Sequence, residues 1–469
     1  MSNRAEKLPK KFISRLEGQL SEEDIIAFKE AFDEFAPVSY RTNPFKPAEI
    51  DFSDITPVPW CDEAHYIAKR PSFAKDPLIF AGAYYVQEAS SMFLWQALKQ
   101  HAPLEKDIKV LDLCAAPGGK STLINSLITE KSLLVANEVV DKRATPLIDN
   151  LVRWGNPNTI VTANYSDSFT QLREYFDVIV ADAPCSGEGM FRKDPKTIDA
   201  WSPMLINSCS DVQKEIVDYI PKSLKAGGLF IYSTCTFSPQ ENEERLEQIL
   251  DSEEFEPLEI DLDPSWGITK IEVEKNGVKA TGYRFIFHKT TGEGLFLTAF
   301  IKKGEPSRHQ KFSVSPKKMK QVFMLRKRES EEMRKWLENG NDFDFYEEED
   351  EIYAIPKNLV QDFKMLFVTQ TVRHQGIKMG RLNKKNNQLI PDHELAVSNI
   401  IASNIPSTEV EYRDAIDYLK KQDMSIKTIQ GVKGWALIKF KGLVLGWVKV
   451  LPNRLNNYYP TEHRLVKNV

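Results

Sequence analysis

The chain has 469 residues, more than one compact domain holds, and this length predicts two to four domains of roughly 100 to 200 residues each. Apolar residues make up 42% and charged residues 28%, which excludes a wholly disordered or collagen-like chain. With 62 basic and 67 acidic residues the net charge is −5, so binding to nucleic acid must rest on local basic patches.

Targeting signals and the number of cysteines indicate in which cellular compartment the protein is expected. No stretch reaches the roughly 18 to 20 apolar residues of a membrane helix, and the start of the chain lacks the apolar core of a secretory signal. The five cysteines form no CxxC pair and no metal-finger spacing, and their odd number favours free thiols in a reducing compartment. We therefore expect a cytoplasmic protein with no membrane partner and no metal. The absence of heptads favours a monomer.

The first hundred residues read as helical and then irregular. Residues 8–32 have apolar positions near helical spacing, and Ser21, followed by acidic residues, predicts the start of a second helix. Residues 41–60 contain several prolines and cannot form one helix.

Residues 107–303 alternate between strand-like and helix-like segments, which predicts a Rossmann-like α/β domain with a parallel sheet covered on both faces. A capping box at Ser238–Glu241 predicts a helix that starts there. Residues 282–288 and 292–303 predict an antiparallel hairpin at the sheet edge. The expected strands are 109–115, 133–139, 159–163, 176–184 and 227–235, and the clearest helices are 141–154 and 205–224.

Charge and glycine content change after residue 303. Residues 302–335 hold twelve Lys or Arg and four Glu, and 341–351 is an acidic block, so we assign 304–351 to a charged linker. The region 352–469 ends in alternating apolar residues with glycine breaks, which predicts a small β-rich module.

A glycine-bearing turn, DLCAAPGGKS at 112–121, follows the first expected strand. Its glycines let a ligand approach the backbone at the start of the next helix. A phosphate loop is disfavoured because Cys114 stands where its first glycine belongs, and the GxGxxG dinucleotide motif is absent. Glu138, at the end of the second expected strand, can bind ribose hydroxyls, which favours S-adenosylmethionine. A plain strand-to-helix turn remains the alternative.

Two cysteines stand at the ends of later strands. Cys185 follows Asp182 at the end of the fourth expected strand, and Cys235 ends the fifth. Because ligands bind beyond the carboxyl ends of parallel strands, both cysteines should face one crevice, where a thiolate can act as a nucleophile. Cys61 and Cys209 are expected to be core residues.

These motifs, in this order, resemble the Sun-type family of RNA (cytosine-5) methyltransferases. The likeness extends over nearly the whole chain and includes features of the bacterial RsmF-type subgroup. The segments that carry it are DLCAAPGGKS (112–121), ANE (136–138), DAPCSG (182–187), STCT (233–236), RTNPFK (41–46), PVPW (57–60), AGAYYVQEASSM (81–92), GEGLF (292–296), GWALIKFKGLVLGWVKV (434–450) and NNYYP (456–460).

The resemblance implies a role for each site residue. Cys235 is implied to be the nucleophile that adds to cytosine carbon 6, and Cys185 to act in product release. Asp182 is implied to hydrogen-bond the cytosine and to border the cofactor, and Lys120 to position the base or lower a thiol pKa. The implied contacts of S-adenosylmethionine are Cys114, Ala115, Ala116, Pro117, Gly118, Gly119, Lys120, Glu138 and Arg143, with Asn164 and Asp167 near the adenine.

The resemblance also implies the partner. DNA enzymes of this chemistry use the PC cysteine and lack the TC motif, so Thr234-Cys235 favours RNA and not DNA. The RsmF-like tail implies 16S ribosomal RNA within the small subunit, an N-terminal RNA-binding extension at 1–106 and a PUA-like C-terminal module. The alternatives are a transfer-RNA methyltransferase, a non-catalytic ribosome-assembly factor and, least favoured, a phosphate-loop ATPase.

Basic and aromatic residues of the last third are candidates for RNA contact. Trp435, Trp447, Tyr458 and Tyr459 can stack on bases, although a β-core role is favoured. Phosphate contacts are expected from residues 302–335 and from Arg373, Lys378, Arg381, Lys384 and Lys385.

Overall fold

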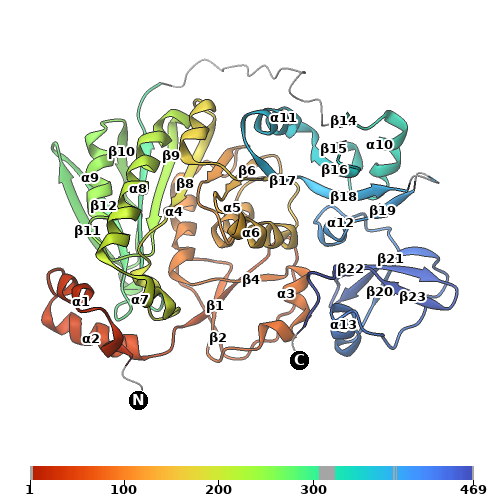
Figure 1. Cartoon of the computed structure of the whole chain (residues 1–469), viewed down its shortest axis with the longest axis horizontal. Helices are drawn as coiled ribbons and strands as arrows, with labels where there is room; N and C mark the ends of the chain where they lie inside the picture. Colours follow the sequence, from red (N-terminus) through yellow and green to blue (C-terminus); the bar gives the residue numbers. More distant parts are fainter. Residues whose placement is uncertain (1–3, 306–322, 384–385, 387, 467–469) are drawn as a thin grey trace.

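The computed structural model describes residues 4–305, 323–383, 386 and 388–466. A large, mostly parallel sheet forms the centre, with the N-terminal helices near one end of it and the C-terminal modules beyond the other (Figure 1). This arrangement confirms the α/β class predicted from the sequence.

The N-terminal region starts with a pair of helices, followed by a small antiparallel sheet of order β2-β3-β1-β4 and two further helices. Ser21 caps the second helix by accepting a hydrogen bond from the Asp24 amide at 3.1 Å, as its sequence predicts. The elements are α1 (Lys10–Glu17), α2 (Glu22–Asp33), β1 (Val38–Thr42), β2 (Ile55–Pro57), β3 (Ala64–Ile67), α3 (Pro77–Ala81), β4 (Tyr84–Val86) and α4 (Leu94–His101).

The central sheet has the order β11-β12-β13-β9-β8-β5-β6-β7-β17, and β10 also pairs with β13. The five strands β9, β8, β5, β6 and β7 are parallel, and two apolar clusters cover the two faces. The chain order reverses between β5 and β8, which is where open α/β sheets bind ligands. The strands are β5 (Lys109–Asp112), β6 (Leu133–Asn137), β7 (Thr159–Thr162), β8 (Phe176–Asp182), β9 (Leu224–Thr234), β10 (Phe255–Leu258), β11 (Thr269–Lys275), β12 (Val278–Phe285) and β13 (Leu295–Lys302), and the helices are α5 (Gly119–Leu127), α6 (Asp141–Trp154), α7 (Lys196–Ala200), α8 (Pro203–Ser223) and α9 (Glu243–Asp251).

Two local predictions for this domain need correction. The expected hairpin forms between β12 and β13, but it is not at the edge, since β13 pairs with β9 and β11 lies outside β12. The helix predicted to start at Ser238 is wrong in its start, because α9 begins at Glu243 with Asn242 as its N-cap. The side chain of Glu241 does not close a capping box, since it hydrogen-bonds the loop that follows Cys185.

The middle region corrects the expected charged linker at 304–351. Within the described part, residues 327–348 form a helix and a strand, and β15 pairs with β16 across the expected boundary at residue 351. A further strand, β17, leaves this region and extends the central sheet beside β7. The elements are β14 (Phe323–Met324), α10 (Lys327–Arg334), β15 (Phe343–Glu348), β16 (Glu351–Pro356), α11 (Val360–Thr369), β17 (Val372–Gln375), β18 (Ile377–Leu382) and β19 (Leu389–Pro391).

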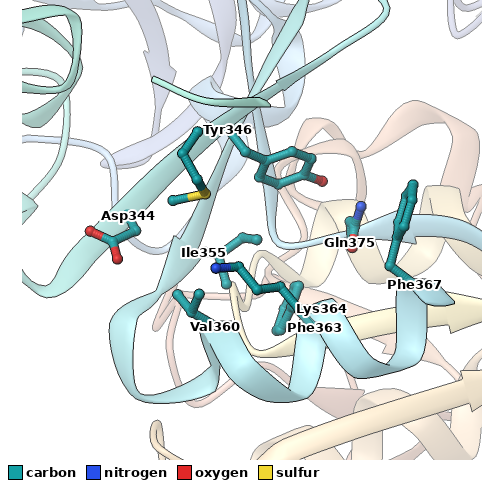
Figure 2. A pocket seen from close by; sticks show the side chains of 9 residues that line it. Asp344, Tyr346, Ile355, Val360, Phe363, Lys364, Phe367 and Gln375 are labelled. Atoms are coloured by element: carbon teal, nitrogen blue, oxygen red, sulfur yellow. The ribbon is translucent and has the colours of Figure 1, made fainter. Parts of the chain in front are cut away.

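A small apolar cavity lies where α11 packs on the hairpin of β15 and β16 (Figure 2). Tyr346 and Phe363 line it and belong to the same apolar cluster as the strands of the central sheet. None of the site residues predicted from the sequence lines this cavity. It is therefore a feature of the junction between the two regions.

The C-terminal module is β-rich, as its sequence predicts, with a four-stranded sheet of order β20-β21-β22-β23. Tyr459 is buried in the core of the module, and Trp447 is buried in the cluster that the module shares with the middle region. Tyr458 is exposed and packs edge-on against the half-buried Trp435. In the described chain, no helix has both the length and the apolar character that a membrane crossing requires. The elements are α12 (His393–Val397), β20 (Ser407–Glu409), α13 (Tyr412–Leu419), β21 (Gly434–Phe440), β22 (Leu443–Leu451) and β23 (Arg454–Asn457).

One buried lysine ties three of these regions together. The ammonium group of Lys46 donates hydrogen bonds to the carbonyls of Ala81, Arg153 and Val397 at 3.1, 2.5 and 2.6 Å. Ala81 and Val397 are the last residues of α3 and α12, and Arg153 is the last but one of α6, so all three carbonyls lie at helix ends where the dipole favours a cation. Lys46 thus fixes the C-terminal modules against the end of α6.

Candidate active site

The glycine-bearing turn joins β5 to α5 and lies against the N-terminal region. Gly118 has a left-handed φ of 110°, and α5 begins at Gly119. A Cβ added to Gly119 would come within 3.3 Å of the Gln87 side chain, so a larger residue would press on that segment. Asp112, buried at the end of β5, accepts a hydrogen bond from Ser121 Oγ at 2.6 Å. Burial raises the pKa of Asp112 to about 7, although the Ser121 hydrogen bond opposes this.

Glu138 stands at the end of β6 and faces the turn. Its Oε1 accepts a hydrogen bond from the Val140 amide at 2.9 Å, and its Oε2 lies 3.4 Å from Nη1 of Arg143. Arg143, from the first turn of α6, also donates to the carbonyl of Ala116 at 3.0 Å. The structure therefore brings the turn, Glu138 and Arg143 together, as the sequence predicts.

Of the two residues expected near an adenine, the structure brings only Asn164 to the strand ends. The amide group of Asn137 donates to the carbonyls of Leu113 and Asn164 and accepts from the Asn164 amide, all at 2.9 to 3.0 Å. Asp167 is exposed, and its hydrogen bonds to Ser168 and Thr170 stay within its own turn. Asn137 was overlooked in the sequence, although it directly precedes Glu138 in the ANE motif.

Two carboxylate oxygens at these strand ends accept no hydrogen bond from the described residues. Asp112 Oδ1 and Glu138 Oε2 are both buried, and Glu138 Oε2 has only the ion pair with Arg143 at 3.4 Å. Buried acceptors without donors are costly unless a ligand satisfies them. Their places at the ends of adjacent strands fit the hydroxyl donors of a ribose.

Lys120 and Asp182 meet across the crevice between α5 and β8. Lys120 Nζ lies 2.7 Å from Asp182 Oδ2, and Asp182 Oδ1 accepts a hydrogen bond from Ser233 Oγ at 2.7 Å. Burial lowers the pKa of Lys120, but the attraction of Asp182 outweighs it and leaves the pKa raised. Lys120 is therefore a cation here. Ser233, which sequence reasoning missed, faces Asp182 because the two residues are paired in register between β8 and β9.

The two strand-end cysteines are in contact. Their sulfurs are 3.1 Å apart, and the backbone amide of Cys235 donates to the sulfur of Cys185 at 3.3 Å. The hydrogen bond with Cys235, together with burial, raises the pKa of Cys185 well above its usual range. Contact with Cys235 and burial therefore favour the protonated form of Cys185.

The other cysteines and the basic residues have different surroundings. Cys61 is buried in the N-terminal region, and Cys209 is half-buried on α8. Among the expected phosphate contacts, Arg373 pairs with Asp141, Lys378 is half-buried between Glu351 and Asp392, and Arg381 is exposed. Lys384, Lys385 and residues 306–322 lie outside the described residues.

Three family models match successive parts of the chain. The model for the 16S rRNA methyltransferase RsmB/F matches residues 99–301. The N-terminal domain of the 16S rRNA methyltransferase RsmF matches 8–89, and the methyltransferase RsmF PUA domain matches 406–465.

Curated relatives and solved structures agree with these models. The chain is 30% identical over 428 residues to the ribosomal RNA small subunit methyltransferase F of Aliivibrio fischeri, covering 87% of this chain and 85% of the relative. It is 30% identical over 450 residues to the Escherichia coli protein of the same name, covering 90% and 89%. The crystal structure of a methyltransferase homologue from Pyrococcus horikoshii is 26% identical, with a TM-score of 0.53 over 65% of this chain and all of that one.

The fold, the polar residues gathered at the strand ends and these matches define an RNA methyltransferase of the RsmB/F type. Sequence identity of 30% to the two relatives, over nearly the whole chain, places the protein in one family within this class. The chain belongs to the RsmF family of 16S rRNA methyltransferases.

Proposed function

We propose that this protein transfers a methyl group from S-adenosylmethionine to carbon 5 of a cytosine in 16S ribosomal RNA. The observation that carries the proposal is the contact between Cys185 and Cys235 at 3.1 Å, beside the Lys120–Asp182 pair. The names of its relatives support the small-subunit RNA as substrate. We further propose that it acts as a cytoplasmic monomer.

The proposed reaction starts with the nucleophile. Carbon 5 of cytosine is a weak nucleophile, and addition of the Cys235 thiolate to carbon 6 converts the ring into an enamine that is reactive at carbon 5. S-adenosylmethionine supplies the electrophilic methyl group. Asp182 is one-third exposed, and its oxygens retain lone pairs beyond those used by Lys120 and Ser233, so it can accept from the amino group of the base and from N3 once that nitrogen is protonated during the addition.

Release of the product uses the second thiol. The proton on carbon 5 passes to water, and the electrons of that C–H bond form the double bond between carbons 5 and 6. The bond between carbon 6 and the sulfur of Cys235 breaks at the same time, and its electrons return to that sulfur. Cys185 lies 3.1 Å from the sulfur of Cys235, and its surroundings raise the pKa of its thiol, so it can donate a hydrogen bond to the departing sulfur. A negative sulfur that is hydrogen-bonded is a better leaving group.

The cofactor is assigned to the crevice at the ends of β5 and β6. We propose that the turn at 114–120 lies against it, that Glu138 accepts the ribose hydroxyls, and that Arg143 holds the turn and Glu138 in place. Asn164 then borders the adenine and Asp182 the side nearest the cytosine. Asp167 is left out of this proposal because its hydrogen bonds are local.

A transfer assay tests the function. Labelled methyl groups from S-adenosylmethionine are offered with naked 16S RNA, with small ribosomal subunits and with bulk transfer RNA, and the labelled nucleoside is identified by chromatography. The proposal expects 5-methylcytidine in the 16S RNA or the subunits. Label in transfer RNA would support the same reaction with transfer RNA as its substrate. No transfer to any of the three RNA pools would favour a non-catalytic binding factor.

A further inference from the structure

A buried carboxylate connects the segments that follow the two cysteines. Glu241 Oε1 accepts a hydrogen bond from the backbone amide of Ser186 at 2.8 Å. Glu241 Oε2 accepts from Ser186 Oγ at 2.6 Å and from Thr236 Oγ1 at 3.2 Å. Ser186 directly follows Cys185 and Thr236 directly follows Cys235. One side chain therefore holds the neighbours of both thiols.

The residue before Cys185 is held by the same network. Gln213 of α8 donates to the carbonyl of Pro184 at 2.8 Å and to Glu241 Oε1 at 3.2 Å. Glu241 and Gln213 have no exposed surface. The two residues that flank Cys185 are thus both anchored through Glu241 or its partner.

The charge of Glu241 is held without a cation. Among the described residues no ion pair includes Glu241, and burial raises its pKa while its hydrogen bonds oppose the rise. Burying a carboxylate that has no cationic partner is costly. The side chain of Glu241 does not cap α9, because this helix begins two residues later, at Glu243. A structural capping role does not account for such a residue.

We propose that Glu241 is a positioning residue that holds Cys185 against the sulfur of Cys235 for the release of the methylated product. This inference rests on the proposed function and adds to it a residue that touches neither the RNA nor the cofactor. The RNA is covalently attached through carbon 6 until the bond to Cys235 breaks. A displaced Cys185 would leave that bond intact for longer.

Cys235 and Cys185 are held by different contacts, so replacing Glu241 should impair product release more than the addition of Cys235 to the base. Cys235 directly follows β9, and its carbonyl accepts a hydrogen bond from the Gly189 amide at 2.9 Å. Asn242 fixes the next residue by donating to the Thr236 carbonyl at 2.9 Å. Cys185 stands in a loop three residues beyond the end of β8. Loss of Glu241 should therefore move Cys185 more than Cys235.

Trapping of the covalent intermediate provides the test. Wild type, Glu241→Ala, Glu241→Gln and Cys185→Ala are each incubated with S-adenosylmethionine and labelled 16S RNA. The samples are then denatured and run on a gel that separates free RNA from protein-bound RNA. Glu243→Gln is the matched control, because Glu243 is the next carboxylate along the chain but pairs with Arg284 of β12.

The expected result is an accumulation of adduct. Glu241→Ala should lower multiple-turnover methylation at least about tenfold, since small misplacements of reacting groups cost that much or more. Its protein-bound RNA should rise towards the level of Cys185→Ala. Glu241→Gln should lie between it and wild type, because the hydroxyls of Ser186 and Thr236 can turn to accept from the amide. Glu243→Gln should match wild type.

Two outcomes would overturn the inference. One is a Glu241→Ala enzyme that turns over at the wild-type rate. The other is a Glu241→Ala enzyme that loses adduct and methyl transfer together in proportion to its loss of folded protein, with binding of S-adenosylmethionine lost in parallel. Absence of methyl transfer by wild type, with no adduct in Cys185→Ala, would instead overturn the proposed function and this inference with it.

Discussion

The sulfurs of Cys185 and Cys235 are 3.1 Å apart although fifty positions separate them in the chain. Their contact follows from the parallel pairing of β8 with β9, which places Asp182 opposite Ser233. The segments that follow the two strands therefore leave the sheet at the same edge. The two cysteines differ in their supports, since Cys235 directly follows β9 and Cys185 stands in a loop three residues beyond β8. The proposed reaction gives them different roles.

Replacing Glu138 should weaken binding of S-adenosylmethionine. Glu138→Gln removes a charged acceptor that we assign to the ribose, and hydrogen bonds to charged groups contribute about 1.5 to 3 kcal/mol. The dissociation constant measured by calorimetry should rise roughly tenfold or more. Lys142→Ala, an exposed change nearby on α6, is the control. An unchanged affinity of Glu138→Gln for S-adenosylmethionine would show that Glu138 does not bind the cofactor.

Replacing Arg41 should destabilise the support of the cofactor turn. Its guanidinium is buried, donates to Thr122 and Ser126 of α5 at 2.7 and 2.9 Å, and stacks 4.6 Å from the Trp154 ring centre. Arg41→Met should lower the free energy of unfolding in urea by about 2 to 4 kcal/mol and weaken cofactor binding. Arg70→Met, at an exposed position, should change neither. Wild-type stability in Arg41→Met would show that the contacts of Arg41 with α5 and Trp154 do not stabilise the fold.

The buried carboxyl of Asp112 should make stability depend on pH. Its pKa is raised from 3.8 to about 7 by burial, so between these values the folded protein binds more protons than the unfolded chain. The contribution of Asp112 to the free energy of unfolding is therefore full below pH 4 and is lost as the pH rises to 7. The stability of wild type relative to Asp112→Asn should fall by about 2 kcal/mol between pH 5 and pH 8 in urea titrations. Parallel pH profiles for the two proteins would contradict the raised pKa.

The aromatic residues of the C-terminal module should separate into core and surface. Trp447 is buried and donates to the Asp392 carbonyl at 2.7 Å, so Trp447→Ala should lower the free energy of unfolding by about 3 to 5 kcal/mol. Tyr458 is 41% exposed, and Tyr458→Ala should stay within about 1 kcal/mol of wild type. Chemical denaturation measures both. A larger loss for Tyr458→Ala would show that it is a core residue.

Much of the catalytic domain could be predicted from the sequence because its signals are local. Buried parallel strands read as short apolar runs, and β6 is buried along its whole length. The helix at Asp141–Trp154 matches its predicted range. The hydrogen bonds of Asn137 and Ser233 could not be predicted, because they depend on which strands lie side by side and in which register.

The failures of prediction have a common physical cause. Ser238 to Glu241 reads as a capping box, but the carboxylate of Glu241 finds partners in a loop fifty-five positions away. The charged stretch after residue 323 reads as a linker, yet its apolar residues, such as Phe345 and Met333, are buried in a core shared with β16 and α12. Long-range packing outweighs local composition in both places.

The proposed reaction requires Cys235 as the nucleophile and Cys185 for release. The direct measurement compares wild type, Cys235→Ala and Cys185→Ala for labelled methyl transfer to 16S RNA and for protein–RNA adduct that survives denaturation. The account predicts no methyl transfer and no adduct for Cys235→Ala, and a trapped adduct with little turnover for Cys185→Ala. Methyl transfer that survives in Cys235→Ala, or an adduct that forms without Cys235, would contradict it.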